Sequence, residues 1–214
     1  MQLFVKVTMS LIQGLGTTMK IFSLTLLMAL PLGLLISLGA MSKFKIIKFP
    51  LKMLIWVIRG TPLMLQLIIF GLGPGLIGIV GMDMFLAVII AFVLNYACYF
   101  AEIFRGGIES ISKGQYEAGA VLGYTRIQIF MRIILPQVIK RIIPPMGNEF
   151  LTLIKDTSLA NTIMIYEITW NAKRMMNSEH ILWPLFYSGL FYLILCGIVT
   201  VIFNYIEKKL DYYQ

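Results

Sequence analysis

Two long segments without a charged residue constrain this chain more than any other feature. Residues 21–41 and 181–206 are uncharged over 21 and 26 positions. A helix needs about 20 mostly apolar residues to cross the hydrocarbon core of a bilayer. The composition agrees, because 59% of the 214 residues are hydrophobic and only 13% are charged, against roughly 25% charged in soluble domains. The sequence therefore predicts an all-α membrane protein and excludes a secreted or cytosolic enzyme.

Three further segments are long enough to span a membrane but are interrupted. Residues 54–72 contain Arg-Gly-Thr-Pro near their start, 84–101 end at Glu102, and 142–165 contain two prolines and three charged residues. We expect five transmembrane helices, at about 21–41, 54–72, 84–101, 142–165 and 181–206.

Residues 1–20 form a separate lead-in to the first predicted span. Their apolar side chains recur at helical spacing. We expect an amphipathic helix that lies in the outer membrane interface, with an irregular lead-in as the alternative.

Lysine and arginine are distributed unevenly between the predicted loops. Of the 18 basic residues, 13 lie in segments 42–59, 102–142 and 207–214, and only three lie in segments 1–19 and 166–180. Basic loops stay on the cytoplasmic side of a membrane. The N-terminus is therefore predicted outside and the C-terminus in the cytoplasm. In so apolar a chain the net charge of +8 indicates contact with membrane lipid and not with nucleic acid.

The predicted cytoplasmic loop between spans three and four carries local helix signals. Ser112 and Thr125 are each followed three residues later by glutamine, which is the pattern of a capping box. Gly123 stands where a helix over 113–122 would need a left-handed end. We expect two short helices within 112–136. They are either surface helices on lipid headgroups or a docking element for another protein.

A run in this loop, Gln115-Tyr116-Glu117-Ala118-Gly119-Ala120-Val121-Leu122-Gly123, resembles the EAA loop of ABC importer permeases. Segments 59–62, 101–108, 144–150 and 155–159 extend the likeness. Together they resemble the membrane subunits of polar amino acid ABC importers, of the histidine/glutamine/arginine type, over roughly residues 10–210. Gly119 departs from the family, which usually has alanine there. Because glycine is less favourable in a helix by about 1 kcal/mol, we expect a slightly looser coupling helix.

The resemblance implies a five-helix permease of the type I importer kind in a bacterial cytoplasmic (inner) membrane. Such a chain pairs with a second permease subunit, identical or related. Two ABC ATPase subunits dock on the EAA loops, and an extracytoplasmic binding protein delivers the amino acid. The implied ATPase-coupling residues are Gln115, Glu117, Ala118, Gly119 and Gly123.

No motif predicts catalysis or metal binding by this chain. The phosphate-binding pattern GxxxxGK[ST] is absent, so we expect no cofactor here, with ATP and Mg²⁺ bound by the partner ATPase. The GxGxxG pattern at 73–78 has no predicted strand before it and is interpreted as a turn. His180 is interpreted as a surface residue of an outer loop, and Cys98 and Cys196 lack the spacing of metal ligands.

Two other functions stay open as alternatives to ATP-driven import. One is a small ion-driven carrier or channel, although five spans without symmetric halves argue against it. The other is a membrane scaffold that recruits a cytoplasmic partner. A scaffold would not explain the charged residues of the fourth span.

Ionisable residues lie within or at the edges of the predicted spans. A charge at the membrane centre costs roughly 2.5–3.5 kcal/mol, so these groups are expected to face one another, a partner subunit or water. Arg59 and Glu102 both lie near the cytoplasmic ends of their spans and are predicted to form a structural ion pair. The alternative is that Arg59 extends to the lipid headgroups.

The polar residues of the fourth span predict the substrate path. A zwitterionic amino acid needs an anion for its ammonium group and donors for its carboxylate. The candidate residues are Glu149, Lys155, Asp156, Thr157 and Ser158. Structural pairing of these charges with a neighbouring helix is the alternative.

Overall fold

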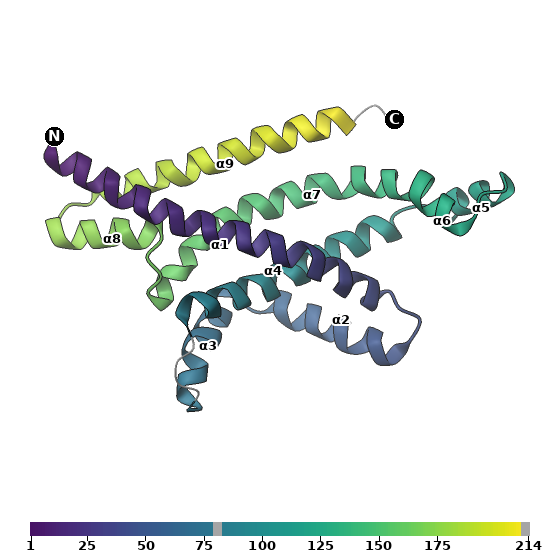
Figure 1. Cartoon of the computed structure of the whole chain (residues 1–214), viewed down its shortest axis with the longest axis horizontal. Helices are drawn as coiled ribbons and strands as arrows, with labels where there is room; N and C mark the ends of the chain where they lie inside the picture. The colour runs from purple at the N-terminus through teal and green to yellow at the C-terminus, as the bar shows by residue number, and fades with distance from the viewer. Residues whose placement is uncertain (79–82, 211–214) are drawn as a thin grey trace.

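The computed structural model describes residues 1–78 and 83–210, and every regular element in these ranges is a helix (Figure 1). The all-α prediction is confirmed for this part of the chain. The α-helices are α1 (Gln2–Ala40), α2 (Lys45–Gly60), α3 (Leu63–Leu76), α4 (Met84–Glu109), α5 (Lys113–Val121), α6 (Arg126–Ile129), α7 (Leu135–Asp156), α8 (Ile168–Glu179) and α9 (Trp183–Leu210). A five-residue π-helical segment, Phe130–Ile134, here called the π-turn, joins α6 to α7. A 3₁₀ segment, Thr157–Ile163, follows α7.

Helices α1, α4 and α9 are each long and apolar enough to cross a membrane. Helices α2 and α3 meet that test only together, and they are bent by 103° at the break between them. The predicted interruption of the segment 54–72 is thus present as a sharp bend, and its crossing of the membrane as one span stays a prediction. Pro62 has no N–H to continue α2, and it holds Thr61 in an extended conformation at φ −117° and ψ 145°.

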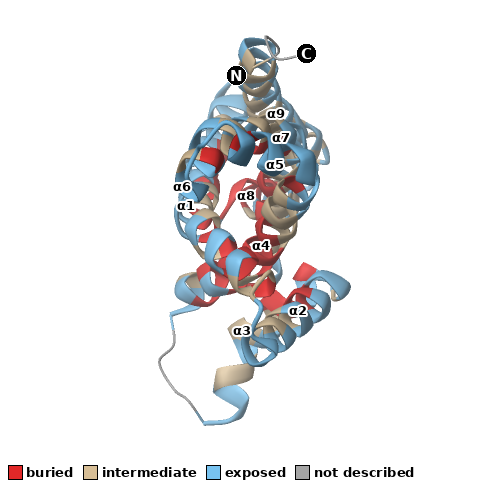
Figure 2. Cartoon of the chain, turned by 90° about the vertical axis from the view of Figure 1, so that its right-hand side faces the viewer, coloured by how far each residue is buried: buried red, intermediate tan, exposed pale blue. Residues whose placement is uncertain are grey.

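The core lies where α1 crosses α4. The largest buried side chains of α4 are Phe92, Tyr96 and Phe100, and Figure 2 shows buried residues concentrated along α4. Gly33 of α1 has no room for a side chain, because a Cβ there would lie 2.8 Å from the carbonyl oxygen of Ala97. Small residues at such crossings let helices approach closely inside a membrane.

Residues 1–20 are continuous with the first predicted span, because α1 has no break at residue 20. The first part of α1 is packed in the protein, with Val7 and Leu11 fully buried beside Ile168 and Met175 of α8. The boundary between a separate lead-in and the first span is therefore not present. The position of this part of α1 in the membrane interface stays a prediction.

The helix signals of the loop are largely reproduced. Helix α5 ends as predicted near Gly123, which has a φ of +77°. Thr125 forms a complete capping box with Gln128, through N–H···O distances of 3.3 and 2.9 Å. Ser112 precedes α5 but its side chain makes no capping hydrogen bond. The loop thus contains the two short helices that the sequence predicts.

The fourth predicted span differs from its expected form. Helix α7 begins at Leu135 instead of residue 142, because the π-turn leads into it directly and Pro136 is tolerated in its first turn. The helix continues regularly through Pro144 and Pro145. At Thr157 the backbone changes to a 3₁₀ helix.

The predicted turn at 73–78 is only partly a turn. Helix α3 extends through Gly73 to Leu76, and Gly78 follows with a φ of +80°. His180 is exposed, as expected, and ends α8 in a left-handed conformation at φ 54°.

Candidate functional site

The predicted coupling residues lie at one end of the molecule, and all of them except Gly119 are exposed. Helices α5 and α6 lie at the end opposite to α8 (Figure 1). Glu117, Ala118 and Gly123 are exposed there. Gln115 is also exposed, but its side chain accepts a hydrogen bond from Gln137 Nε2 of α7 at 3.2 Å. The motif therefore offers a surface to a partner while it is attached to α7.

Gly119 is the one buried residue of α5. A Cβ on Gly119 would lie 2.8 Å from Cγ1 of Ile129 and 3.0 Å from Cδ1 of Ile133. These isoleucines belong to α6 and to the π-turn. The absent side chain of Gly119 thus lets α5 pack directly on the segment that runs into α7, and α5 is an intact helix around it.

A cavity of about 490 Å³, here called the substrate cavity after the function proposed for it below, lies between three parts of the chain. The α2–α3 corner contributes Arg59 and Thr61, α4 contributes Asn95, Tyr96 and Tyr99, and α7 contributes Glu149, Thr152 and Asp156. Two carboxylates and one guanidinium group therefore line the same space. Such a cavity can hold a small molecule that carries both an anionic and a cationic group.

The fourth-span prediction is only partly reproduced by this geometry. Glu149 and Asp156 line the substrate cavity, whereas Lys155, Thr157 and Ser158 are not among its lining residues. Lys155 is exposed, and Ser158 is half-buried. Thr157 is fully buried, and its hydroxyl donates to the Ile154 carbonyl at 2.6 Å. The cation in the cavity is Arg59.

An amide network holds the α2–α3 corner that carries Arg59. Pro62 cannot donate to the Ile58 carbonyl, so Gln66 Nε2 donates to that oxygen instead, at 2.9 Å. Gln66 Nε2 also contacts Thr61 Oγ1 at 2.8 Å, and Asn95 Nδ2 donates to Gln66 Oε1 at 3.0 Å. Because Gln66 and Asn95 are buried, these bonds fix the corner to α4 in a low-dielectric environment.

Aromatic side chains of α4 orient the charges of the cavity. The Tyr96 hydroxyl donates to Asp156 Oδ2 at 2.8 Å. The guanidinium carbon of Arg59 lies 5.0 Å from the centre of the Tyr99 ring, within the range of a cation–π contact. The sequence reasoning missed Asn95, Tyr96 and Tyr99. Their polar groups within the otherwise apolar segment 84–101 were the available signal.

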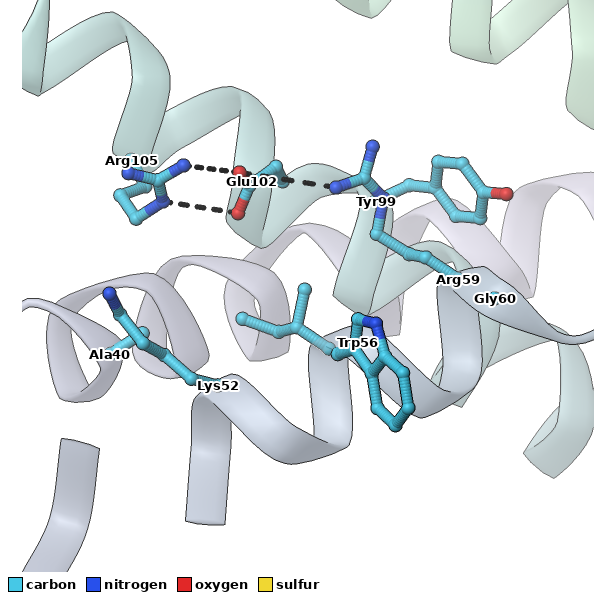
Figure 3. Close-up of a pocket in the computed structure, with 9 residues that line it drawn as sticks. Ala40, Lys52, Trp56, Arg59, Gly60, Tyr99, Glu102 and Arg105 are labelled. Atoms are coloured by element: carbon cyan, nitrogen blue, oxygen red, sulfur yellow. Dashed lines mark hydrogen bonds and ion pairs between the residues drawn. The ribbon is translucent and has the colours of Figure 1, made fainter. Parts of the chain in front are cut away.

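Arg59 and Glu102 lie together, as the sequence predicts, but at the limit of an ion pair. Arg59 Nη1 is 4.0 Å from Glu102 Oε1, and the two side chains are 37% and 29% exposed. Figure 3 shows Glu102 between the guanidinium groups of Arg59 and Arg105. Arg105 is the nearer partner. Its Nε donates to Glu102 Oε2 at 3.1 Å, and its Nη2 donates to the other oxygen.

No cluster of three or more His, Cys, Asp or Glu side chains that could hold a metal ion occurs in residues 1–78 and 83–210.

The family follows from comparison with known proteins. Residues 29–212 match the family described as "Binding-protein-dependent transport system inner membrane component". The chain belongs to this family. The resemblance to ABC importer permeases is thereby confirmed, and the chain is a multi-pass permease component and not an enzyme.

Relatives and solved structures extend the match over nearly the whole chain. The chain is 37% identical to the L-cystine transport system permease protein TcyB of Bacillus subtilis, over 94% of this chain and 86% of that protein. It is also 37% identical to the arginine transport system permease protein ArtQ of the same organism, over 94% and 92%. A solved amino acid ABC transporter with histidines shares 32% identity and a TM-score of 0.89, over 96% of both chains. These relatives do not support a carrier or channel that works without ATP.

Proposed function

We propose that this chain is the membrane subunit of an ATP-driven importer of polar amino acids and that the substrate binds in the substrate cavity. The observation that carries the proposal is the juxtaposition of Arg59 with Glu149 and Asp156 in one cavity of a permease. Arg59 binds the substrate carboxylate, and one of the two carboxylates binds its ammonium group. The curated relatives act on cystine and arginine.

The charge of the cavity favours one kind of amino acid. Two carboxylates and one guanidinium group line it. A zwitterionic substrate pairs its carboxylate with the guanidinium group and its ammonium group with one carboxylate. The second carboxylate of the cavity then has no charged group of the substrate to bind. We therefore expect a substrate with a second cationic group, such as arginine, to bind better than glutamine.

The proposed complex contains two ABC ATPase subunits, a second permease subunit and an extracytoplasmic binding protein. The ATPase subunits dock on the exposed residues of α5 and on Gly123. ATP and Mg²⁺ are bound by those subunits, and this chain supplies no cofactor site.

The proposed topology has five spans in the bacterial inner membrane, namely α1, the bent pair α2–α3, α4, α7 with its 3₁₀ extension, and α9. The N-terminus is outside and the C-terminus is in the cytoplasm. The basic α1–α2 connection, α5 with α6, and the basic end of α9 lie toward the same end of the molecule (Figure 1), which supports this orientation.

Packing of α5 on α6 and an uninterrupted helical path from α6 to α7 connect the proposed docking surface to the cavity. Helix α5 packs on Ile129 through Gly119, and the π-turn continues into α7. The same α7 carries Glu149 and Asp156. A displacement of α5 by the ATPase subunits is therefore expected to move the two carboxylates relative to Arg59 and to change substrate affinity.

Uptake by the reconstituted complex tests the proposal. The permease, its ATPase and its binding protein are placed in proteoliposomes and supplied with labelled L-arginine, L-histidine, L-glutamine and L-cystine in turn. We expect accumulation of at least one amino acid, with arginine preferred over glutamine, only when ATP reaches the ATPase side. Uptake without ATP, driven by an ion gradient, would contradict the proposal.

A further inference from the structure

A second cavity adjoins the substrate cavity on the side of α5. It has a volume of about 480 Å³ and is here called the inner cavity (Figure 3). The two cavities share Arg59, Gly60 and Tyr99 in their linings. The inner cavity continues along α4 to Glu102 and Arg105, one to two turns beyond Tyr99 toward α5. Arg59 therefore stands between two spaces that follow each other along α4.

Glu102 is a fixed anion in the inner cavity. Both of its oxygens accept hydrogen bonds from Arg105. Arg105 is held in turn by an ion pair with Glu109 one turn further along α4. These three side chains come from one helix, so their arrangement does not depend on the position of α2.

Arg59 has a fixed backbone and a side chain that can move. Its backbone ends α2 at the corner held by Gln66 and Asn95. Its guanidinium group lies over the flat face of Tyr99, and its contact with Glu102 is long, at 4.0 Å. A rotation of the side chain can therefore bring the guanidinium group closer to Glu102 or into the substrate cavity while the backbone stays in place.

We infer that Glu102 competes with the substrate carboxylate for Arg59 and thereby promotes release of the amino acid toward the cytoplasm. This inference rests on the proposed function, since it needs a substrate carboxylate in the substrate cavity. When the guanidinium group of Arg59 binds the substrate carboxylate, it moves away from Glu102. When Arg59 returns to Glu102, the carboxylate loses its partner and leaves by the inner cavity. Glu102 is thus a positioning residue that sets affinity through Arg59.

Equilibrium binding and uptake kinetics of Glu102→Gln test this inference. The probe is the labelled amino acid of the panel above that the wild-type complex accumulates. Removal of the competing charge is expected to tighten binding to the nucleotide-free complex by about two- to fivefold, the size of one half-exposed ion pair. The KM of uptake should fall as well, and the maximal rate should fall because release becomes slower.

Glu179→Gln is the matched control. Glu179 is also a glutamate in an ion pair, with Lys6, but it lines neither cavity and belongs to α8, away from Arg59 and Arg105. The Kd, the KM and the maximal rate of this variant should equal those of the wild type. Glu102→Asp keeps the charge but shortens its reach toward Arg59, so its effect should lie between those of wild type and Glu102→Gln.

Three outcomes would overturn the inference. One is an assembled Glu102→Gln complex whose affinity is unchanged or weaker. Another, if Glu102→Gln does not assemble, is a Glu102→Asp complex with wild-type affinity. In both cases the wild type still imports its amino acid, so the proposed function stands. The third is a wild-type complex that binds and imports no amino acid of the panel, which refutes the proposed function and the inference together.

Discussion

The two ends of α7 are held in different ways. Near its start, α7 is joined to α5 and α6 by apolar packing around Ile129 and by the Gln115–Gln137 hydrogen bond. Near its end, Glu149 and Asp156 line the substrate cavity, whose shape depends on buried amides of the α2–α3 corner. The first arrangement is suited to transmit the proposed displacement, and the second places charged groups around an open space. The difference indicates that one helix can serve as a rigid link and as one wall of a binding site.

Reversal of charge at Glu117 should have the largest effect, because it acts at the end that is proposed to bind the ATPase. Glu117→Lys is expected to abolish co-purification of the ATPase subunits and ATP-driven uptake, since a charge of the wrong sign is placed in the docking surface. Detergent extraction and a pull-down of the permease measure this directly. The same change at Glu179, at the opposite end of the molecule, should leave the ATPase bound. Full retention of the ATPase by Glu117→Lys would show that α5 is not part of the docking surface.

Loss of the side-chain amide of Gln66 should destabilise the α2–α3 corner, which helps to form the substrate cavity at the other end of α7. Gln66→Leu leaves Asn95 Nδ2 without its acceptor, and it leaves the Ile58 carbonyl with only the Thr61 hydroxyl, at 3.4 Å, as a donor. A buried group that loses its partner is expected to cost about 1–3 kcal/mol. Thermal unfolding of the purified complex and substrate binding should both show the loss. Gln13→Leu, at an exposed position of α1, is the control. Equal stability of the two variants would show that the corner does not depend on Gln66.

Variants of Glu149 and Lys155 distinguish a residue that lines the substrate cavity from a nearby charged residue that does not. Glu149→Gln removes a charge from the lining of the substrate cavity and is expected to raise the KM by about tenfold or more if Glu149 binds the ammonium group. Lys155→Met should leave the KM unchanged, because Lys155 is exposed outside the cavity lining. Uptake kinetics of both variants check this pair. An unchanged KM in both would exclude Glu149 as the carboxylate that binds the ammonium group and leave that role to Asp156, whereas an unchanged KM in Asp156→Asn as well would contradict the assignment of the substrate cavity.

Gly119→Ala should have the smallest effect, and it tests how tightly α5 is packed. Helix propensity alone favours alanine by about 1 kcal/mol, but the added methyl group must displace Ile129, at a cost of about 1–3 kcal/mol. We expect a net loss of about 1 kcal/mol in the stability of the loop, read as faster hydrogen exchange of the α5 amides. Gly119→Ala combined with Ile129→Val should restore the exchange rate. Slower exchange in Gly119→Ala alone would show that the site has room for a methyl group.

The helices of the proposed docking end could be predicted because their signals are local. Gly123, Thr125 and Gln128 specify their own backbone conformations, and the structure reproduces them. The exception is Ser112, whose side chain makes no capping bond although its spacing is correct.

The substrate cavity could be predicted only in part, because its residues come together from distant segments. The sequence indicated Glu149 and Asp156, but it suggested the adjacent Lys155 as their cationic counterpart instead of Arg59, about 90 residues earlier. Successive side chains of a helix point about 100° apart around its axis. Lys155 is therefore exposed, although the preceding Ile154 is buried, and it does not reach the cavity. The sequence did indicate the interruption at Arg-Gly-Thr-Pro within 54–72, but not the direction of the bend that places Arg59 beside the cavity.

The most direct test of the account is to join α5 to α7 covalently. Gln115 and Gln137 are replaced by cysteine in a Cys98→Ala/Cys196→Ala background, and the pair is linked with a short bifunctional thiol reagent in the reconstituted complex. If α5 and α7 move as one unit, ATP-driven uptake after linking will equal uptake by the unlinked variant. Uptake that is lost on linking would show that α5 moves independently of α7, and it would contradict the proposed route from ATPase to substrate.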